Sequence, residues 1–217
     1  MILAIDTATR FVSIALHDGH RLLAEHTWLT QAHHTVELTP ALADMLATQT
    51  IEAQALDAIA VPTGPGSYTG LRIGMSVAKG IARSRTPAIP LIGVPTMSIL
   101  AAAQPRLSSR LCVVTEAGRR RVNAQFYHWK LGGWQAEGEP FLATWPELAE
   151  KLGSGIQVSG EITDEGRDIL AALGSAITLS LPAYGLRRAG FLAELAYQRL
   201  RHGETDDPAT LAPLYLR

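Results

Sequence analysis

A glycine-rich stretch at residues 59–74, IAVPTGPGSYTGLRIG, constrains the fold more than any other part of this sequence. An apolar run leads into a glycine–proline turn, and a helix is expected to begin near Thr69 or Gly70. Gly64 and Gly66 can adopt positive φ angles, so another backbone or an anion can approach them closely. A turn between a strand and a helix also presents free N–H groups and the positive end of the helix dipole, which together suit an anion.

The turn does not match the established phosphate-binding patterns. No lysine follows Gly70, as a P-loop requires, and Thr69 stands where a dinucleotide-binding pattern has its third glycine. Ser67 and Thr69 are natural N-cap residues for the helix. Two interpretations therefore stay open, a structural turn and a phosphate cradle.

Asp6 and Thr7, at the end of the first expected strand, raise the same question. A carboxylate at a strand tip that faces a glycine turn is suited to holding a metal-bound phosphate. Asp6 can equally accept hydrogen bonds from the backbone of the loop at residues 7–10. Both interpretations of Asp6 stay open.

Composition places the chain among ordinary globular proteins. Of its 217 residues 47% are hydrophobic, and its net charge is −1, so no overall field attracts nucleic acid or anionic lipid. One cysteine, Cys112, excludes an internal disulfide and a zinc site made of cysteines. Because the sequence has no basic, apolar leader and no apolar run of about 18 residues, we expect a soluble, cytoplasmic protein without a membrane span.

Hydrophobic patterning predicts two halves of alternating strands and helices. The first half is expected to open with an antiparallel three-stranded meander over residues 2–27. Strands at 56–61 and 89–94 and helices at 33–47, 70–83 and 97–103 follow. The second half restarts after the polar segment 104–109, with strands at 111–115, 122–129, from 134, 156–159 and 177–179 and helices from 144, at 164–173 and at 189–202. We therefore expect duplicated lobes at residues 1–104 and 105–217, with the helix 189–202 able to pack on the first lobe.

The helix expected at 70–83 contains several small residues, which allow a neighbouring element to approach it closely. Gly74 and Gly80 lie in its interior, where each glycine costs about 1 kcal/mol relative to alanine. These glycines need a packing reason, which either the chain itself or a helix of another chain can supply. The apolar helix expected at 33–47 is a natural second member of such a surface. Its adjacent histidines, His33 and His34, cannot bind one metal from one helix face, which requires i and i+4 spacing.

Four segments resemble the TsaB (YeaZ) family. They are Ile2–Thr7, Gly64–Gly74, Gly93–Thr96 and the terminal Pro213–Arg217, PLYLR. The resemblance implies an α/β, two-lobed fold of the actin-like, sugar-kinase and Hsp70 (ASKHA) type with duplicated ribonuclease H-like lobes. It also implies the dimerisation subunit of the bacterial machinery that makes N6-threonylcarbamoyladenosine in tRNA. Such a subunit pairs with the catalytic subunit TsaD, works with the ATPase TsaE, and meets tRNA through the complex; a homodimer through the same helices is a further expectation.

The resemblance places the partner surface on the first two helices. The residues expected there are Val36, Leu42, Met45, Leu46, Ile73, Gly74, Val77, Ala78 and Ile81. The phosphate-site residues become a vestigial nucleotide site, made of Asp6, Thr7, Gly64, Gly66, Ser67 and Thr69. No cofactor is expected, although weak ATP or ADP binding stays open.

The catalytic relatives carry a His-x-x-x-His metal pair after the strand that ends near Val94. This chain has no histidine from Gly93 to Leu100, and no pair among its seven histidines has i, i+4 spacing. The resemblance therefore implies a non-catalytic subunit, with no catalytic residue and no metal. The alternative is an ATP- or metal-dependent transferase or glycoprotease-like peptidase of the same superfamily, using Asp6 and the glycine turn.

The second half departs from the family at Glu116-Ala117-Gly118, where Asp-Ala-Arg is common. The run Arg119–Arg121 follows and has two interpretations. It is either a solvated, charged edge of a strand or a phosphate-binding site that contacts tRNA directly. The near-neutral net charge favours the solvated edge.

Overall fold

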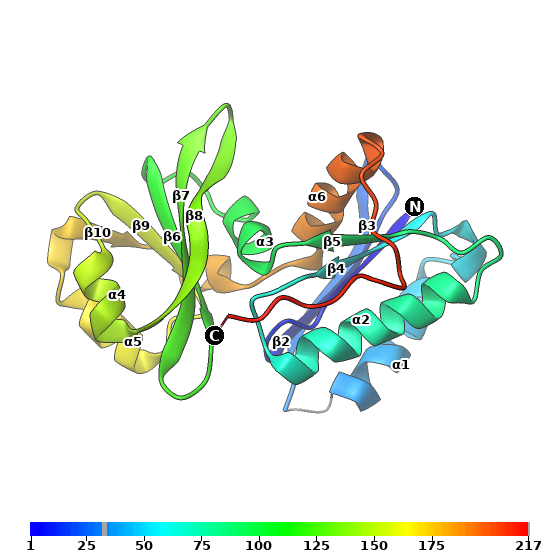
Figure 1. The fold of residues 1–217 in the computed structure, drawn as a ribbon, viewed down its shortest axis with the longest axis horizontal. Helices are drawn as coiled ribbons and strands as arrows, with labels where there is room; N and C mark the ends of the chain where they lie inside the picture. Colours follow the sequence, from blue (N-terminus) through cyan, green and yellow to red (C-terminus); the bar gives the residue numbers. More distant parts are fainter. Residues whose placement is uncertain (32–33, 217) are drawn as a thin grey trace. The chain divides into compact units, whose positions relative to one another are not determined.

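The computed structural model describes residues 1–31 and 34–216, which form a mixed α/β protein with two five-stranded sheets (Figure 1). The chain forms two compact units. The first contains Met1–Ile99 and Arg188–Leu214, and the second contains Leu100–Arg187 with Tyr215 and Leu216. This division differs from the expected boundary after residue 104, because the chain returns to the first unit at Arg188 and its last helix packs on the first sheet.

The first sheet has the strand order β3-β2-β1-β4-β5. Strands β1, β2 and β3 form the predicted antiparallel meander, and β4 and β5 add to β1 in parallel. The bounds are β1 Ile2–Asp6, β2 Phe11–His17, β3 Leu22–Leu29, β4 Ala58–Pro62 and β5 Leu91–Val94. Strands β1 and β4 are buried along their whole length, so both faces of the sheet are covered.

Alternate residues of β1 belong to two different cores. Leu3 and Ile5 pack under helices α1 (His34–Thr48) and α2 (Tyr68–Arg83). Ile2 and Ala4 pack on the opposite face, under helix α6 (Ala189–Arg201) and Ile99 of helix α3 (Thr96–Ala102). A strand presents successive side chains to opposite faces, so this alternation follows from the strand geometry. The first helix was predicted from His33, which lies outside the described residues.

The second sheet repeats the topology of the first. Its order, β8-β7-β6-β9-β10, matches β3-β2-β1-β4-β5 strand for strand, with an antiparallel meander followed by two parallel additions. The predicted duplication is therefore confirmed. The strands are β6 Arg110–Glu116, β7 Arg121–Lys130, β8 Gly133–Thr144, β9 Ile156–Gly160 and β10 Ile177–Leu179. Helices α4 (Trp145–Lys151) and α5 (Asp164–Ala171) also belong to this unit, and a capping box formed by Thr144 and Glu147 starts α4.

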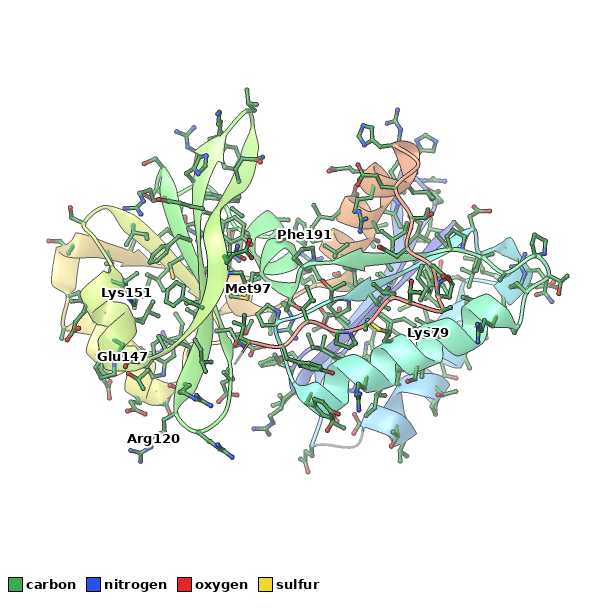
Figure 2. The ribbon with its side chains drawn as sticks, viewed as in Figure 1. Lys79, Met97, Arg120, Glu147, Lys151 and Phe191 are labelled. Atoms are coloured by element: carbon green, nitrogen blue, oxygen red, sulfur yellow. The ribbon has the colours of Figure 1, made fainter. Side chains whose placement is uncertain are left out.

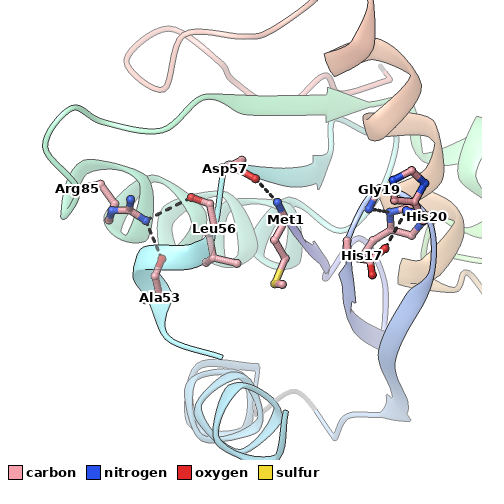
Figure 3. A network of polar contacts seen from close by, with 9 residues as sticks. Met1, His17, Gly19, His20, Ala53, Leu56, Asp57 and Arg85 are labelled. Atoms are coloured by element: carbon pink, nitrogen blue, oxygen red, sulfur yellow. Dashed lines mark hydrogen bonds and ion pairs between the residues drawn. The ribbon is translucent and has the colours of Figure 1, made fainter. Parts of the chain in front are cut away.

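Polar contacts tie the start of the chain to the segment before β4 (Figure 3). The amino group of Met1 pairs with the carboxylate of Asp57. Arg85, just after α2, donates to the carbonyls of Ala53 at 2.8 Å and Leu56 at 3.2 Å. The two Arg85 bonds join the segment that follows α2 to the segment that precedes β4. No helix in the described part of the chain is long and apolar enough to cross a membrane.

Candidate functional site

The glycine turn joins β4 to α2, and its backbone is hydrogen-bonded within the chain. The N–H of Gly64 donates to Oγ1 of Thr96 at 3.1 Å, and that of Ser67 donates to the carbonyl of Ala8 at 2.6 Å. Ser67 caps α2 by accepting the N–H of Gly70 at 3.1 Å. Three backbone N–H donors of the turn thus already have acceptors within the chain.

Backbone surrounds the turn so closely that glycine is required. Gly64 has φ 111°, and a Cβ there would meet the carbonyl oxygen of Leu214. A Cβ on Gly66 would meet the carbonyl oxygen of Ala8. The C-terminal tail is held at this place by the N–H of Leu214, which donates to the carbonyl of Thr63 at 2.7 Å. The glycines therefore have packing reasons within the chain.

Asp6 and Thr7 lie beside the turn and are fully buried. Asp6 accepts the N–H of Ala8 at 2.9 Å, which is the loop-capping bond considered from the sequence. Thr7 donates its hydroxyl to the carbonyl of Gly70 at 2.7 Å. The structure thus brings Thr7, Ser67 and Gly70 together, whereas Thr69 lines a groove on the outer face of α2. The interpretation of this place as a vestigial nucleotide site stays a prediction.

The outer faces of α1 and α2 form the candidate partner surface, but four expected members lie in the core of the chain. Leu42, Met45, Gly74 and Ala78 are buried, so their side chains are not on the surface. Helical spacing placed them on shared faces but did not show which of those faces the sheet covers. The expected members that reach the surface are Val36, which is 70% exposed, and the partly buried Leu46, Ile73, Val77 and Ile81.

A groove of about 340 Å³ runs along this surface. Its lining residues are Thr35, Tyr68, Thr69, Arg72, Ile73, Ser76 and Val77. The guanidinium of Arg72 lies over the ring of Tyr68, 4.4 Å from its centroid. Sequence reasoning missed Tyr68 and Arg72; the available signal was the i, i+4 row formed by Arg72, Ser76 and Gly80.

Gly80 differs from Gly74 in what surrounds it. A Cβ on Gly74 would take the space of the Thr7 side chain. A Cβ on Gly80 would meet no described atom within 4 Å. The cost of a glycine in a helix is thus explained by the fold at Gly74 and not at Gly80.

The two helices carry charged side chains of opposite sign. Helix α1 carries Glu37 and Asp44 and no lysine or arginine, while α2 carries Arg72, Lys79 and Arg83 and no acidic residue. Glu37 accepts the indole N–H of Trp28 at 2.8 Å. In the described part of the chain, no three His, Cys, Asp or Glu side chains gather as metal ligands would.

Comparison with known proteins decides the family. The family model "TsaD: tRNA N6-adenosine threonylcarbamoyltransferase" matches residues 27–142. Among curated proteins, "tRNA threonylcarbamoyladenosine biosynthesis protein TsaB" of Bacillus subtilis (strain 168) is 30% identical, over 100% of this chain and 93% of the relative. The protein of the same description in Escherichia coli (strain K12) is 32% identical, over 100% and 94%. The chain belongs to the TsaB family.

Solved structures agree with membership of the TsaB family. "YeaZ from Pseudomonas aeruginosa" superposes with a TM-score of 0.77 at 26% identity, over 99% of both chains. Component A of (R)-2-hydroxyglutaryl-CoA dehydratase from Acidaminococcus fermentans has a TM-score of 0.51 at 13% identity, over 92% of this chain and 98% of the other, and shows the fold alone. Together with the repeated sheet topology, these likenesses show the expected two-lobed ASKHA fold.

Proposed function

We propose that this chain is a non-catalytic subunit in the biosynthesis of N6-threonylcarbamoyladenosine in tRNA, and that it works by binding a TsaD-type catalytic chain. The curated relatives are named for this biosynthesis, and the matching family model describes the threonylcarbamoyltransferase itself. The ATPase TsaE would join this pair, and tRNA would meet the assembled complex.

The segment after β5 supports a non-catalytic role. It lies where the resemblance places the histidine pair of the catalytic relatives, yet Gly93–Leu100 contains no histidine. In this chain the segment forms the start of α3, where Met97, Ile99 and Leu100 are fully buried. The hydroxyl of Thr96 accepts the N–H of Gly64, so it supports the glycine turn. These residues are used for packing.

The outer faces of α1 and α2 support the proposal that another protein chain binds there. Val36 is 70% exposed, and its neighbour Thr35 lines the groove together with Ile73 and Val77. Gly80 lies on the same face, and no described atom lies within 4 Å of the position that a Cβ would take there. Relative to alanine, this glycine destabilises α2 by about 1 kcal/mol, and no contact among the described residues explains it. A helix of another chain that approaches closely over Gly80 would supply the missing packing reason.

The charges of this face favour a partner of the same fold. When two chains with equivalent helices meet about a two-fold axis, α1 of one chain can face α2 of the other. The acidic α1, with Glu37 and Asp44, then lies against the basic α2, with Arg72 and Lys79. A stable interface of this kind buries about 1,600 Å² in total. A homodimer through the same helices would compete with the TsaD-type partner.

Co-purification of the tagged chain with TsaD from the same organism tests this surface. The variants Gly80→Arg and Ser76→Arg place a long charged side chain on the exposed face without entering the core, so both are expected to fold and to lose TsaD. The matched control is Ala171→Arg, which alters an exposed helix position in the second unit. If both α2 variants recover TsaD at the yield of the control, the proposed face is wrong.

Reconstitution tests the function itself. Modified tRNA is measured with TsaD, TsaE and the adenylate-forming step, with and without this chain. We expect modification to require the chain, and the Gly80→Arg variant not to restore it. Modification at an undiminished rate without the chain would contradict the proposed role.

A further inference from the structure

The turn between β6 and β7 holds three arginines that the proposed pairing face does not use. Arg119 and Arg120 form the middle of the turn, and Arg121 begins β7. The N–H of Arg121 donates to the carbonyl of Gly118 at 3.0 Å, and the N–H of Ala117 donates to the carbonyl of Arg121 at 2.9 Å. The backbone closes this turn, so the arginine side chains are not needed for its closure.

The backbone of the turn favours other residues. The φ angles are 51° at Arg119 and 58° at Arg120, in the left-handed region that side chains other than Asn and Asp adopt rarely. Two successive positive φ angles are the pattern of a type I′ turn, for which Asn-Gly is preferred. Local stability therefore does not explain two arginines at these positions.

No described carboxylate pairs with the three arginine side chains. Arg119 and Arg120 are exposed, and Figure 2 shows Arg120 at the turn end of the hairpin, pointing away from the sheet. Thr144, which lies opposite Arg121 in the sheet, holds the carboxylate of Glu147 at 2.8 Å in the capping box. The positive charge of the turn is thus left available to an outside ligand.

A second neighbouring carboxylate is also engaged. Glu161 accepts the N–H of Glu116, the last residue of β6, at 3.0 Å. It also forms an ion pair with the buried Arg187 at 2.5 Å. An internal role for the three arginines as partners of this carboxylate is therefore not needed.

We infer that the Arg119–Arg121 turn contacts the phosphodiester backbone of RNA. One guanidinium group can bind two phosphate oxygens at once, and it keeps its charge at every physiological pH. Consecutive arginines therefore suit the successive phosphates of an RNA backbone. The inference rests on the proposed function, which brings a tRNA to the complex and so favours RNA over an acidic protein as the ligand. Because the net charge of the chain is only −1, the contact is local and its strength depends steeply on salt.

The double variant Arg119→Asn/Arg120→Gly tests the inference without threatening the fold. It removes two cations and installs the residues that a type I′ turn prefers, so it should melt no lower than the wild type. The matched control is Lys130→Gln/Arg167→Gln, which removes two exposed cations of the same unit, at the far end of β7 and on α5. The two double variants have the same net charge.

Binding of unmodified tRNA is measured by filter retention, for the chain alone and for its complex with TsaD, across about 50–200 mM salt. We expect the Asn-Gly variant to bind about tenfold more weakly or worse, with a slope of log affinity against log salt that is less steep by about 1.5. The control should match the wild type. Competition by polyglutamate of equal charge should be much weaker than competition by tRNA.

Two results would overturn the inference. One is an Asn-Gly variant that binds tRNA with the affinity and salt slope of the wild type while still eluting with TsaD; this leaves the proposed function standing. The other is polyglutamate that displaces tRNA as well as tRNA itself does, which would point to an acidic protein as the ligand. Failure of the wild-type chain to elute with TsaD would instead contradict the proposed function, while the chain-alone measurement still tests the arginines.

Discussion

Thr7 and Gly74 are matched in shape: the side chain of Thr7, beyond the end of β1, fills the position that a Cβ on Gly74 would take in α2. The hydroxyl of Thr7 also donates to the carbonyl of Gly70 at 2.7 Å. One side chain therefore bonds the first turn of α2 and sets how closely the helix lies on the first sheet. Gly74 is thus a packing residue of the fold, and a large substitution there would test folding rather than partner binding.

A double-mutant cycle measures this match. Gly74→Ala should lower the free energy of unfolding by about 1–3 kcal/mol, because the new methyl group meets Thr7. Thr7→Ala should lower it by about 1 kcal/mol through the lost hydrogen bond. The double variant should lose less than the sum of the two, since removal of the hydroxyl makes room for the methyl group. Urea denaturation gives all three values, and strict additivity would contradict the match.

Gly80→Ala should raise the free energy of unfolding, whereas Gly74→Ala should lower it. Nothing among the described residues lies within 4 Å of the new methyl group, and alanine favours the helix by about 1 kcal/mol over glycine. The isolated chain should therefore gain up to about 1 kcal/mol of unfolding free energy in the same urea experiment. A loss of stability would show that Gly80 has an internal packing role and would remove its support for a partner.

ATP with magnesium should give no micromolar binding to the isolated chain. The N–H groups of Gly64, Ser67 and Gly70 already bond within the chain, so these three donors are not available to a phosphate. Isothermal titration calorimetry measures this directly, with Asp6→Ala as the control variant. Micromolar binding that disappears in Asp6→Ala would restore the enzymatic alternative.

Cys112 should make stability fall at high pH. Burial raises the pKa of its thiol from about 9 to about 12, against a smaller opposing effect of the Arg110 charge. Between these values the unfolded chain loses the proton while the folded chain keeps it, so the thiol favours unfolding by about 1.4 kcal/mol per pH unit. Below pH 9 the contribution does not vary with pH. Urea denaturation at several pH values should show a shallower decline for Cys112→Ala, and equal slopes would contradict the buried, neutral thiol.

Asp206 holds the C-terminal tail to the edge of the first sheet. Its carboxylate accepts the N–H of Gly93 at 2.8 Å, and its own N–H donates to the carbonyl of Leu91 at 2.8 Å. Asp206→Ala should expose the edge of β5 and cost about 1 kcal/mol, with faster hydrogen exchange at Gly93. Arg199 pairs with both Asp206 and Glu204, each at 3.2 Å. Glu204→Ala removes one of these ion pairs but leaves the Gly93 bond, so it should exchange as the wild type does. Equal exchange in the two variants would contradict the role of Asp206.

Local sequence patterns were sufficient to predict the helices and strands and to recognise the family. The Asp18-Gly19 turn after β2, the capping box of Thr144 and Glu147, and the Ser67 cap of α2 each depend on hydrogen bonds between residues a few positions apart. For this reason they can be recognised in the sequence, and the repeated order of strands predicted the duplicated sheets. The absence of histidine from Gly93 to Leu100 needed no coordinates either.

Tertiary structure decided which residues face the core and which face outward. Helical spacing grouped Gly74 with Ala78 and Leu42 with Met45, but the covering of those faces by the first sheet depends on β1 and β4, which are remote in sequence. The return of the chain to the first unit at Arg188 is likewise a long-range contact. Thr7 is far from Gly74 along the chain, so only the packed structure distinguishes the glycine that the fold requires from Gly80, which it leaves open.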